Sequence, residues 1–172
     1  YLFGLAIQAF FVNLAIFGMS GDVEFDYSAF LLLGMALALG IDPGTATTGF
    51  GLVRSLNDGS LEMVEFGIIS TPKEEAAHHR LVQLYDEMKK LIKRHKPDSV
   101  GVEKLFFQRN ISTAIAVGQA RGVVMLAIAQ ANLDVAEYTP NEVKQAVAGY
   151  GSADKKQVKE MVRVLLSMPS IP

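Results

Sequence analysis

Cysteine is absent from the 172 residues of this chain. Its absence excludes a disulfide scaffold and any zinc site that depends on thiolate ligands. It also fits a reducing compartment, and we predict a cytoplasmic protein. Hydrophobic residues make up 50% of the chain and charged residues 20%, a balance that can form a buried core and argues against global disorder. The length suits one domain of ordinary size.

Positive charge is missing from the start of the chain. All 16 Lys and Arg residues lie beyond residue 50, and residues 104–172 hold eight of them against five acids. The formal net charge of −2 alone does not suggest a nucleic-acid partner. The mildly basic C-terminal half is a weak indication of an anionic partner.

Residues 1–34 do not match the rest of the chain, because they hold three acids and no base. Tyr1–Met19 is apolar and long enough to cross a membrane, but it lacks the basic flank of a signal peptide. Three interpretations stay open: a translated upstream stretch with Met35 as the true start, a membrane helix, or a buried core element. We predict a functional domain at 35–172, with membrane contact only if the first segment is genuine.

Apolar runs and turn residues predict the elements of that domain. Three strands joined by short turns, with Asn57-Asp58-Gly59 as a hairpin signal, indicate an antiparallel meander. Helices and two further strands then alternate, which indicates parallel crossovers. The predicted fold is α/β and ribonuclease-H-like, with a five-stranded mixed sheet flanked by helices. The predicted ranges are strands at 35–41, 49–55, 61–70, 98–103 and 133–138, and helices from Thr71 to Pro97, at 113–131, from Thr139, and at 153–167.

Two carboxylates are the sharpest candidates for chemistry. Asp42 and Glu103 each follow an apolar run, so each lies at the carboxyl end of a predicted strand, where open α/β sheets form their sites. If the two strands are neighbours, the carboxylates converge, and hard oxygen ligands of this kind suit Mg²⁺ or Mn²⁺. The alternative is that Asp42 only caps the Asp-Pro-Gly turn.

Other candidate sites fail on their spacing. The Gly44–Gly49 segment is followed by Phe50 and Gly51, whereas a phosphate loop needs Lys and then Ser or Thr. The segment 149–152 lacks the third glycine of a dinucleotide fingerprint. His78 and His79 have no metal-binding pattern around them and are predicted to lie at the surface.

Two basic segments could contact DNA. Residues 104–110, which include Phe106 and Arg109, mix aromatic, basic and amide groups, as loops that stack on bases and hold phosphates do. The alternative is an ordinary loop with its phenylalanines in the core. Lys155 and Lys156 open the last helix, where cations oppose the helix dipole, so a phosphate contact would explain them.

Five segments together resemble the RuvC family of bacterial junction resolvases: 40–51, 102–110, 118–123, 143–158 and 161–169. The resemblance implies a homodimer that resolves four-way (Holliday) DNA junctions by paired symmetric nicks, using two Mg²⁺ ions per active site. It implies that Asp42 and Glu103 are catalytic metal ligands. It also implies a branch-migration motor as a partner.

The resemblance assigns further roles by position. Phe106 matches an aromatic residue that contacts bases, and Lys144 and Lys155 match basic residues that bind junction DNA; we add Arg109 and Lys156 as DNA contacts. The 113–131 helix resembles the main dimer contact. Arg substitutions at Ala116 or Val124 would test that role.

The chain departs from the family at both ends. The family lacks residues 1–34, and it continues beyond Pro172 with a helix that carries further catalytic acids, for which Asp154 is not a substitute. We therefore expect this chain to cut junctions poorly. Other function classes remain open: a nucleotide-binding protein of the actin and sugar-kinase superfold, a non-catalytic junction-binding module, and a membrane-anchored protein.

Overall fold

The computed structural model describes residues 37–44, 46–58, 60–104 and 111–170. Five strands and four helices fill these ranges, and the sheet order is β3-β2-β1-β4-β5. The elements are β1 (Leu37–Asp42), β2 (Thr47–Ser55), β3 (Leu61–Ser70), α3 (Ala77–His95), β4 (Ser99–Glu103), α4 (Ile111–Gln130), β5 (Val135–Tyr138), α5 (Pro140–Ala148) and α6 (Lys155–Leu165).

The sheet is mixed, as predicted. β1, β2 and β3 pair in antiparallel fashion, whereas β4 pairs in parallel with both β1 and β5. The hairpin between β2 and β3 is closed by Asp58, whose Oδ1 accepts from the Ser60 backbone N–H at 2.9 Å. β1, β2 and β3 are therefore joined by short connections, whereas the chain reaches the parallel strands β4 and β5 through the helices α3 and α4.

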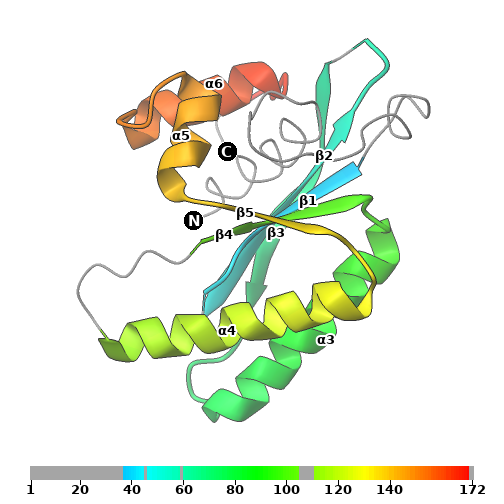
Figure 1. Ribbon diagram of the computed structural model, residues 1–172, viewed down its shortest axis with the longest axis vertical. Coiled ribbons are helices and arrows are strands. Elements are labelled where there is room, and N and C mark those ends of the chain that lie inside the picture. The colour runs from blue at the N-terminus through cyan, green and yellow to red at the C-terminus, as the bar shows by residue number, and fades with distance from the viewer. Residues whose placement is uncertain (1–36, 45, 59, 105–110, 171–172) are drawn as a thin grey trace.

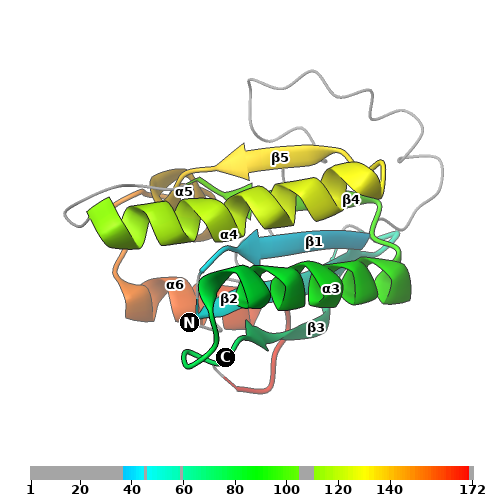
Figure 2. The same ribbon diagram turned by 90° about the horizontal axis from the view of Figure 1, so that it is seen from below.

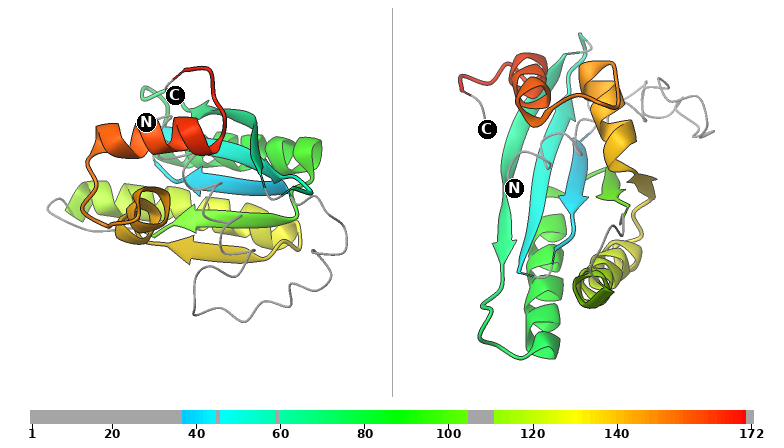
Figure 3. Two further views of the ribbon diagram at one scale, coloured as in Figure 1. Left: turned by 90° about the horizontal axis from the view of Figure 1, so that it is seen from above. Right: turned by 90° about the vertical axis from the view of Figure 1, so that its left-hand side faces the viewer.

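The sheet is the middle of three layers. α3 and α4 run side by side on one face, and α5 and α6 cross the other face (Figures 1, 2 and 3). Side chains alternate between these layers along each strand. Leu39 and Ile41 of β1 pack with α3 and α4, whereas Ala38 packs with α5 and α6.

Side-chain caps define the starts of α5 and α6. The Thr139 hydroxyl accepts from the Glu142 backbone N–H at 3.2 Å, and Glu142 accepts from the Thr139 N–H at 2.6 Å. Asp154 and Gln157 make the same reciprocal pair at α6. Each of these reciprocal pairs is a capping box, which satisfies backbone N–H groups that have no partner within the helix.

The predicted start of the first helix at Thr71 is wrong, because α3 begins at Ala77. The Thr71 backbone N–H donates to the Ala46 carbonyl at 3.1 Å, which ties Thr71 to the residue before β2, directly after β3 has ended. Its hydroxyl accepts from Arg80 Nε at 3.1 Å, so a tertiary contact occupies the group that would have capped the helix. His78 and His79 are exposed, as predicted. Among the described residues, no helix is long and apolar enough to cross a membrane.

Candidate active site

Asp42 and Glu103 lie next to each other at the ends of two inner strands, on the edge of the sheet where its parallel strands have their carboxyl ends. This edge is called the carboxylate edge. β1 and β4 are parallel neighbours whose last paired residues are Ile41 and Val102, so each carboxylate comes one residue later. Val102 packs with α3 and α4, as Ile41 does, so Asp42 and Glu103 both face the α5–α6 side. The predicted convergence of the two carboxylates is confirmed.

The electrostatics of the pair favour a bound cation. The Asp42 carboxyl is half-buried, and this burial raises its pKa, while a side-chain hydrogen bond with Glu103 works in the opposite direction. Two carboxyl groups this close repel each other when both are ionised, unless a proton or a cation lies between them. Their oxygens are the donors that Mg²⁺ and Mn²⁺ prefer, so the pair fits the predicted metal.

Three glycines form a row across the strands that carry the carboxylates. Gly40 pairs with Gly51 on one side and with Gly101 on the other, and Gly40 and Gly101 come two residues before Asp42 and Glu103 on the same face. All three glycines are buried, and they contribute no side chain beside the carboxylates.

The turn after Asp42 requires glycine at position 44. A Cβ atom on Gly44 would lie 2.3 Å from the Thr47 carbonyl oxygen. The Thr48 hydroxyl closes the same turn, because it donates to the Gly44 carbonyl at 3.0 Å. The Asp-Pro-Gly segment is therefore good turn chemistry and also fixes the end of β1 that carries Asp42.

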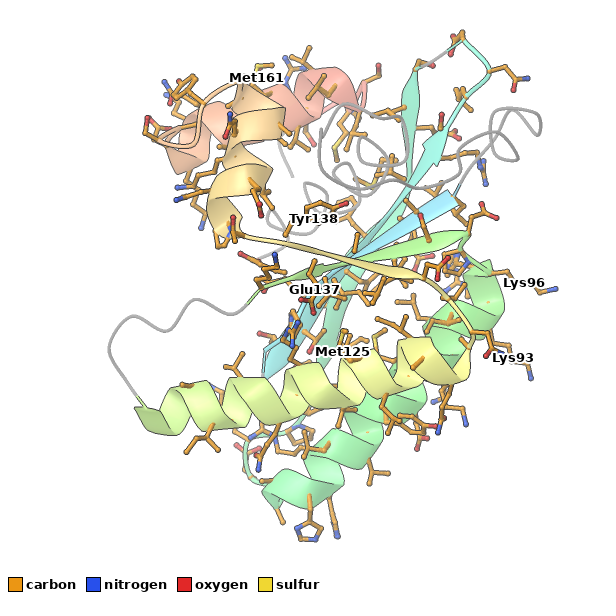
Figure 4. All side chains as sticks on the ribbon, viewed as in Figure 1. Lys93, Lys96, Met125, Glu137, Tyr138 and Met161 are labelled. Carbon is orange, nitrogen blue, oxygen red and sulfur yellow. The ribbon has the colours of Figure 1, made fainter. Side chains whose placement is uncertain are left out.

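Sequence reasoning left Tyr138 and Lys104 out of the candidate site. Tyr138 is the partner of Glu103 across β4 and β5, is only 9% exposed, and lies on the α5 side of the sheet (Figure 4). The Lys104 backbone N–H donates to the Tyr138 carbonyl at 2.8 Å, and its side chain is exposed. The signal available in the sequence was that the fifth predicted strand also ends at this edge.

The start of α5 lies at the same edge. The Thr139 backbone N–H holds the pKa of the Glu142 carboxyl below its usual range, and the charge of Lys104 acts in the same direction. Lys144 lies one turn into α5 and is half-buried. The structure therefore places Lys104 and α5, which carries Lys144, at the carboxylate end of the sheet.

Lys155 and Lys156 are exposed on the first turn of α6. The predicted cost of cations at this position is offset, because Asp154 Oδ1 accepts from the backbone N–H groups of Lys156 and Gln157, both at 2.8 Å. The cap occupies those N–H groups. The lysine side chains, not the helix terminus, are therefore the groups available to an anion.

Two of the sequence-based expectations have other outcomes. Phe106 and Arg109 lie outside the described residues. Val124 is fully buried against the sheet, so it is not on an outer face of α4 and was the wrong position for a test of dimerisation. Among the described residues, no cluster of three or more His, Cys, Asp or Glu side chains could hold a metal, so within them Asp42 and Glu103 have no third ligand of these types.

Comparison with known proteins identifies the relatives of this chain. A family model for the crossover junction endodeoxyribonuclease RuvC matches residues 38–172. The chain belongs to the RuvC family. A RuvC endodeoxyribonuclease of Chloroflexus aurantiacus is 53% identical over 135 residues, which are 78% of this chain and 82% of the relative. One of Desulfitobacterium hafniense is 54% identical over 136 residues, covering 79% and 82% of the two chains.

Solved RuvC structures confirm the ribonuclease-H-like fold. RuvC of T. thermophilus in complex with a Holliday junction substrate matches with a TM-score of 0.75 at 34% identity, over 80% of this chain and 83% of that one. The yeast mitochondrial Holliday junction resolvase matches with a TM-score of 0.58 at 13% identity, over 75% of this chain and 64% of that one. The second likeness concerns the fold alone.

Proposed function

We propose that this protein is a metal-dependent endonuclease that resolves four-way DNA junctions. The observation that carries the proposal is the Asp42–Glu103 pair, which lies at the ends of adjacent parallel strands in a chain of the RuvC family. We further propose the paired symmetric nicks that the resemblance implies. Each copy of the chain then cuts one strand.

Asp42 and Glu103 hold the catalytic cation, Mg²⁺ or its substitute Mn²⁺. A divalent cation supplies Lewis acidity at a phosphodiester and makes an attacking hydroxide available near neutral pH. The two side chains fix the position of that charge, because both project from the ends of rigid, hydrogen-bonded strands.

Basic side chains around the same edge hold the DNA backbone. Lys104 directly follows Glu103, Lys144 lies in α5, and Lys155 and Lys156 lie at the start of α6. Their contacts are with phosphates, so they add affinity and position the junction without reading its sequence. The Phe106–Arg109 segment adds base and phosphate contacts.

We propose a homodimer formed through α4. This helix is apolar around its circumference, and its outer side leaves Ile115 60% and Leu126 52% exposed. A helix that is hydrophobic on all sides is normally covered on all sides. Arg at Leu126 should therefore dissociate the dimer, whereas Arg at Val82, an apolar residue of α3 that is 58% exposed, adds the same charge outside α4 and should leave the dimer intact. Sedimentation velocity measures both.

The experiment that tests the function separates binding from cutting. Asp42→Asn and Glu103→Gln should abolish Mg²⁺-dependent nicking of a synthetic four-way junction, because each removes a metal-binding charge. Both variants should keep or improve junction affinity, since repulsion between the carboxylates and phosphate falls. Asp134→Asn, an exposed acid at the other end of the sheet, is the matched control. Loss of junction binding in a folded Asp42→Asn variant would contradict the proposal.

A second candidate function is a junction-binding module that cuts poorly. It is favoured by the site itself, since the described residues supply two acidic ligands and a two-metal reaction needs more. Paired cuts by the chain as it stands, lost in Asp42→Asn, would exclude it. Residues 35–172 as the functional unit, a cytoplasmic location and the branch-migration motor as a partner remain proposals that rest on the resemblance.

A further inference from the structure

A groove between α3 and α4 lies at the end of the molecule opposite to the carboxylate pair. Its cavity volume is about 630 Å³. The groove is lined by the second half of α3 and the end of α4, and α3 ends just before β4 begins, whereas Glu103 is the last residue of β4. The groove is also on the other face of the sheet.

Three exposed lysines follow the second half of α3 and are called the lysine stripe. Lys89 and Lys93 lie one turn apart on the helix, and Lys96 is the left-handed residue that caps its C-terminal end. Lys89 and Lys93 line the cavity, together with Lys90. Figure 4 shows Lys93 and Lys96 near the C-terminal end of α3.

The charge of this stripe is not compensated within the described part of the chain. Lys90 pairs with Glu87 at 2.7 Å, and Arg94 pairs with Glu65 at 3.2 Å, but no carboxylate of the described residues pairs with a stripe lysine. Lys89 lies over the Tyr85 ring, 5.1 Å from its centre. The dipole of α3 accounts for cations in its last turn, but Lys89 comes earlier. Asp86, the one acid in the lining, leaves the groove positive.

The floor of the groove is apolar. Ile92 is 8% and Ala127 is 1% exposed, and Ala131 continues this surface at the end of α4. A hydrogen bond between the Tyr85 hydroxyl and Gln130 ties the two helices together beside it. Small side chains on α4 keep the groove open, so it can receive an apolar side chain between the two helices.

We propose that this groove docks an acidic amphipathic segment of a partner protein. Carboxylates of the segment would meet the lysine stripe, and its apolar side chains would enter the groove, as in other helix-in-groove complexes. A duplex fits less well, because an apolar floor offers nothing to a phosphate. The position leaves the carboxylate edge open, so the partner and DNA could bind together.

The test uses a fluorescein-labelled helical peptide with Glu at positions i, i+4 and i+7 and Leu on the adjacent side of the helix. Fluorescence anisotropy should detect saturable binding that weakens as salt is added. Lys93→Glu should weaken this binding by about tenfold, because an attraction becomes a repulsion. Lys73→Glu, the same change at an exposed lysine outside the groove, should leave it unchanged. A peptide with Leu replaced by Ser should bind more weakly.

Three results would overturn the proposal. The peptide with Gln in place of Glu could bind equally well, Lys93→Glu could weaken binding of a labelled DNA duplex instead, or it could change the oligomeric state in sedimentation. Junction cleavage is measured in parallel. Because Lys93 is remote from Asp42 and Glu103, cleavage by Lys93→Glu should equal that of the unaltered protein, so failure of the nuclease proposal would leave the peptide result intact.

Discussion

Replacing Asp42 by Asn should stabilise the cation-free protein at neutral pH and remove its response to Mg²⁺. Burial raises the pKa of the Asp42 carboxyl, so the folded protein disfavours its charged form. The stability that this group contributes is fully present below its unfolded pKa of about 3.9 and is lost as pH rises through the higher folded value. Asn carries no charge at any pH and avoids that loss.

The size of the effect follows from the geometry of the pair. Two unit charges about 4 Å apart repel each other by about 4 kcal/mol at an effective dielectric constant of 20. Solvent at this half-buried edge reduces the repulsion, and a proton shared between Asp42 and Glu103 removes part of it. We expect a net gain of about 1–3 kcal/mol for Asp42→Asn, equivalent to a rise in Tm of roughly 3–10 °C for a domain of this size.

Thermal denaturation in EDTA and then in Mg²⁺ measures both parts of this prediction. In EDTA the Tm difference between Asp42→Asn and the unaltered protein should be small in acid and should grow towards neutral pH. Mg²⁺ should raise the Tm of the unaltered protein only, because a cation that binds the native state stabilises it. Asp134→Asn should match the unaltered protein throughout. An Asp42→Asn variant that is no more stable in EDTA at neutral pH would refute the reasoning.

Substitutions at three further positions test the Gly44 turn and the start of α6. Gly44→Ala should cost about 1–3 kcal/mol in urea denaturation, because its Cβ would lie 2.3 Å from the Thr47 carbonyl oxygen; an unchanged midpoint would contradict this clash. Asp154→Ala should cost about 1 kcal/mol by removing the cap of α6, and Asp154→Asn should cost less. Lys155→Ala should reduce the salt dependence of junction binding by about one unit of slope, and an unchanged slope would exclude a phosphate contact.

The sequence was sufficient for the parts of the fold that local pattern controls. Apolar runs that end in Asp42 and Glu103 placed both carboxylates at strand ends, and Thr139 with Glu142 gave a cap that the structure confirms. The start of α3 could not be predicted in this way. Thr71 has good capping chemistry, but its hydroxyl binds Arg80, a contact that exists only after the chain has folded.

The sequence also did not predict which side of α4 packs against the sheet. An apolar helix with no polar side gives no sequence signal for which side chains face the sheet, so Val124 could not be distinguished from Leu126. Tyr138 and Lys104 were missed for a related reason. Their position beside Glu103 depends on the pairing of β4 with β5, which local pattern does not specify.

The negative charge of Asp42 and Glu103 limits the number of divalent cations that the site can bind. Two divalent cations carry four positive charges, whereas Asp42 and Glu103 supply two negative charges, and no further ligand cluster exists among the described residues. A second Mg²⁺ or Mn²⁺ held close to the first would meet strong repulsion without more anionic oxygens. Without DNA, titration calorimetry with Mn²⁺ should therefore detect one weak site per chain, absent in Asp42→Asn and retained in Asp134→Asn. Two ions per chain that are both lost in Asp42→Asn would show that residues outside the described ranges complete a two-metal site.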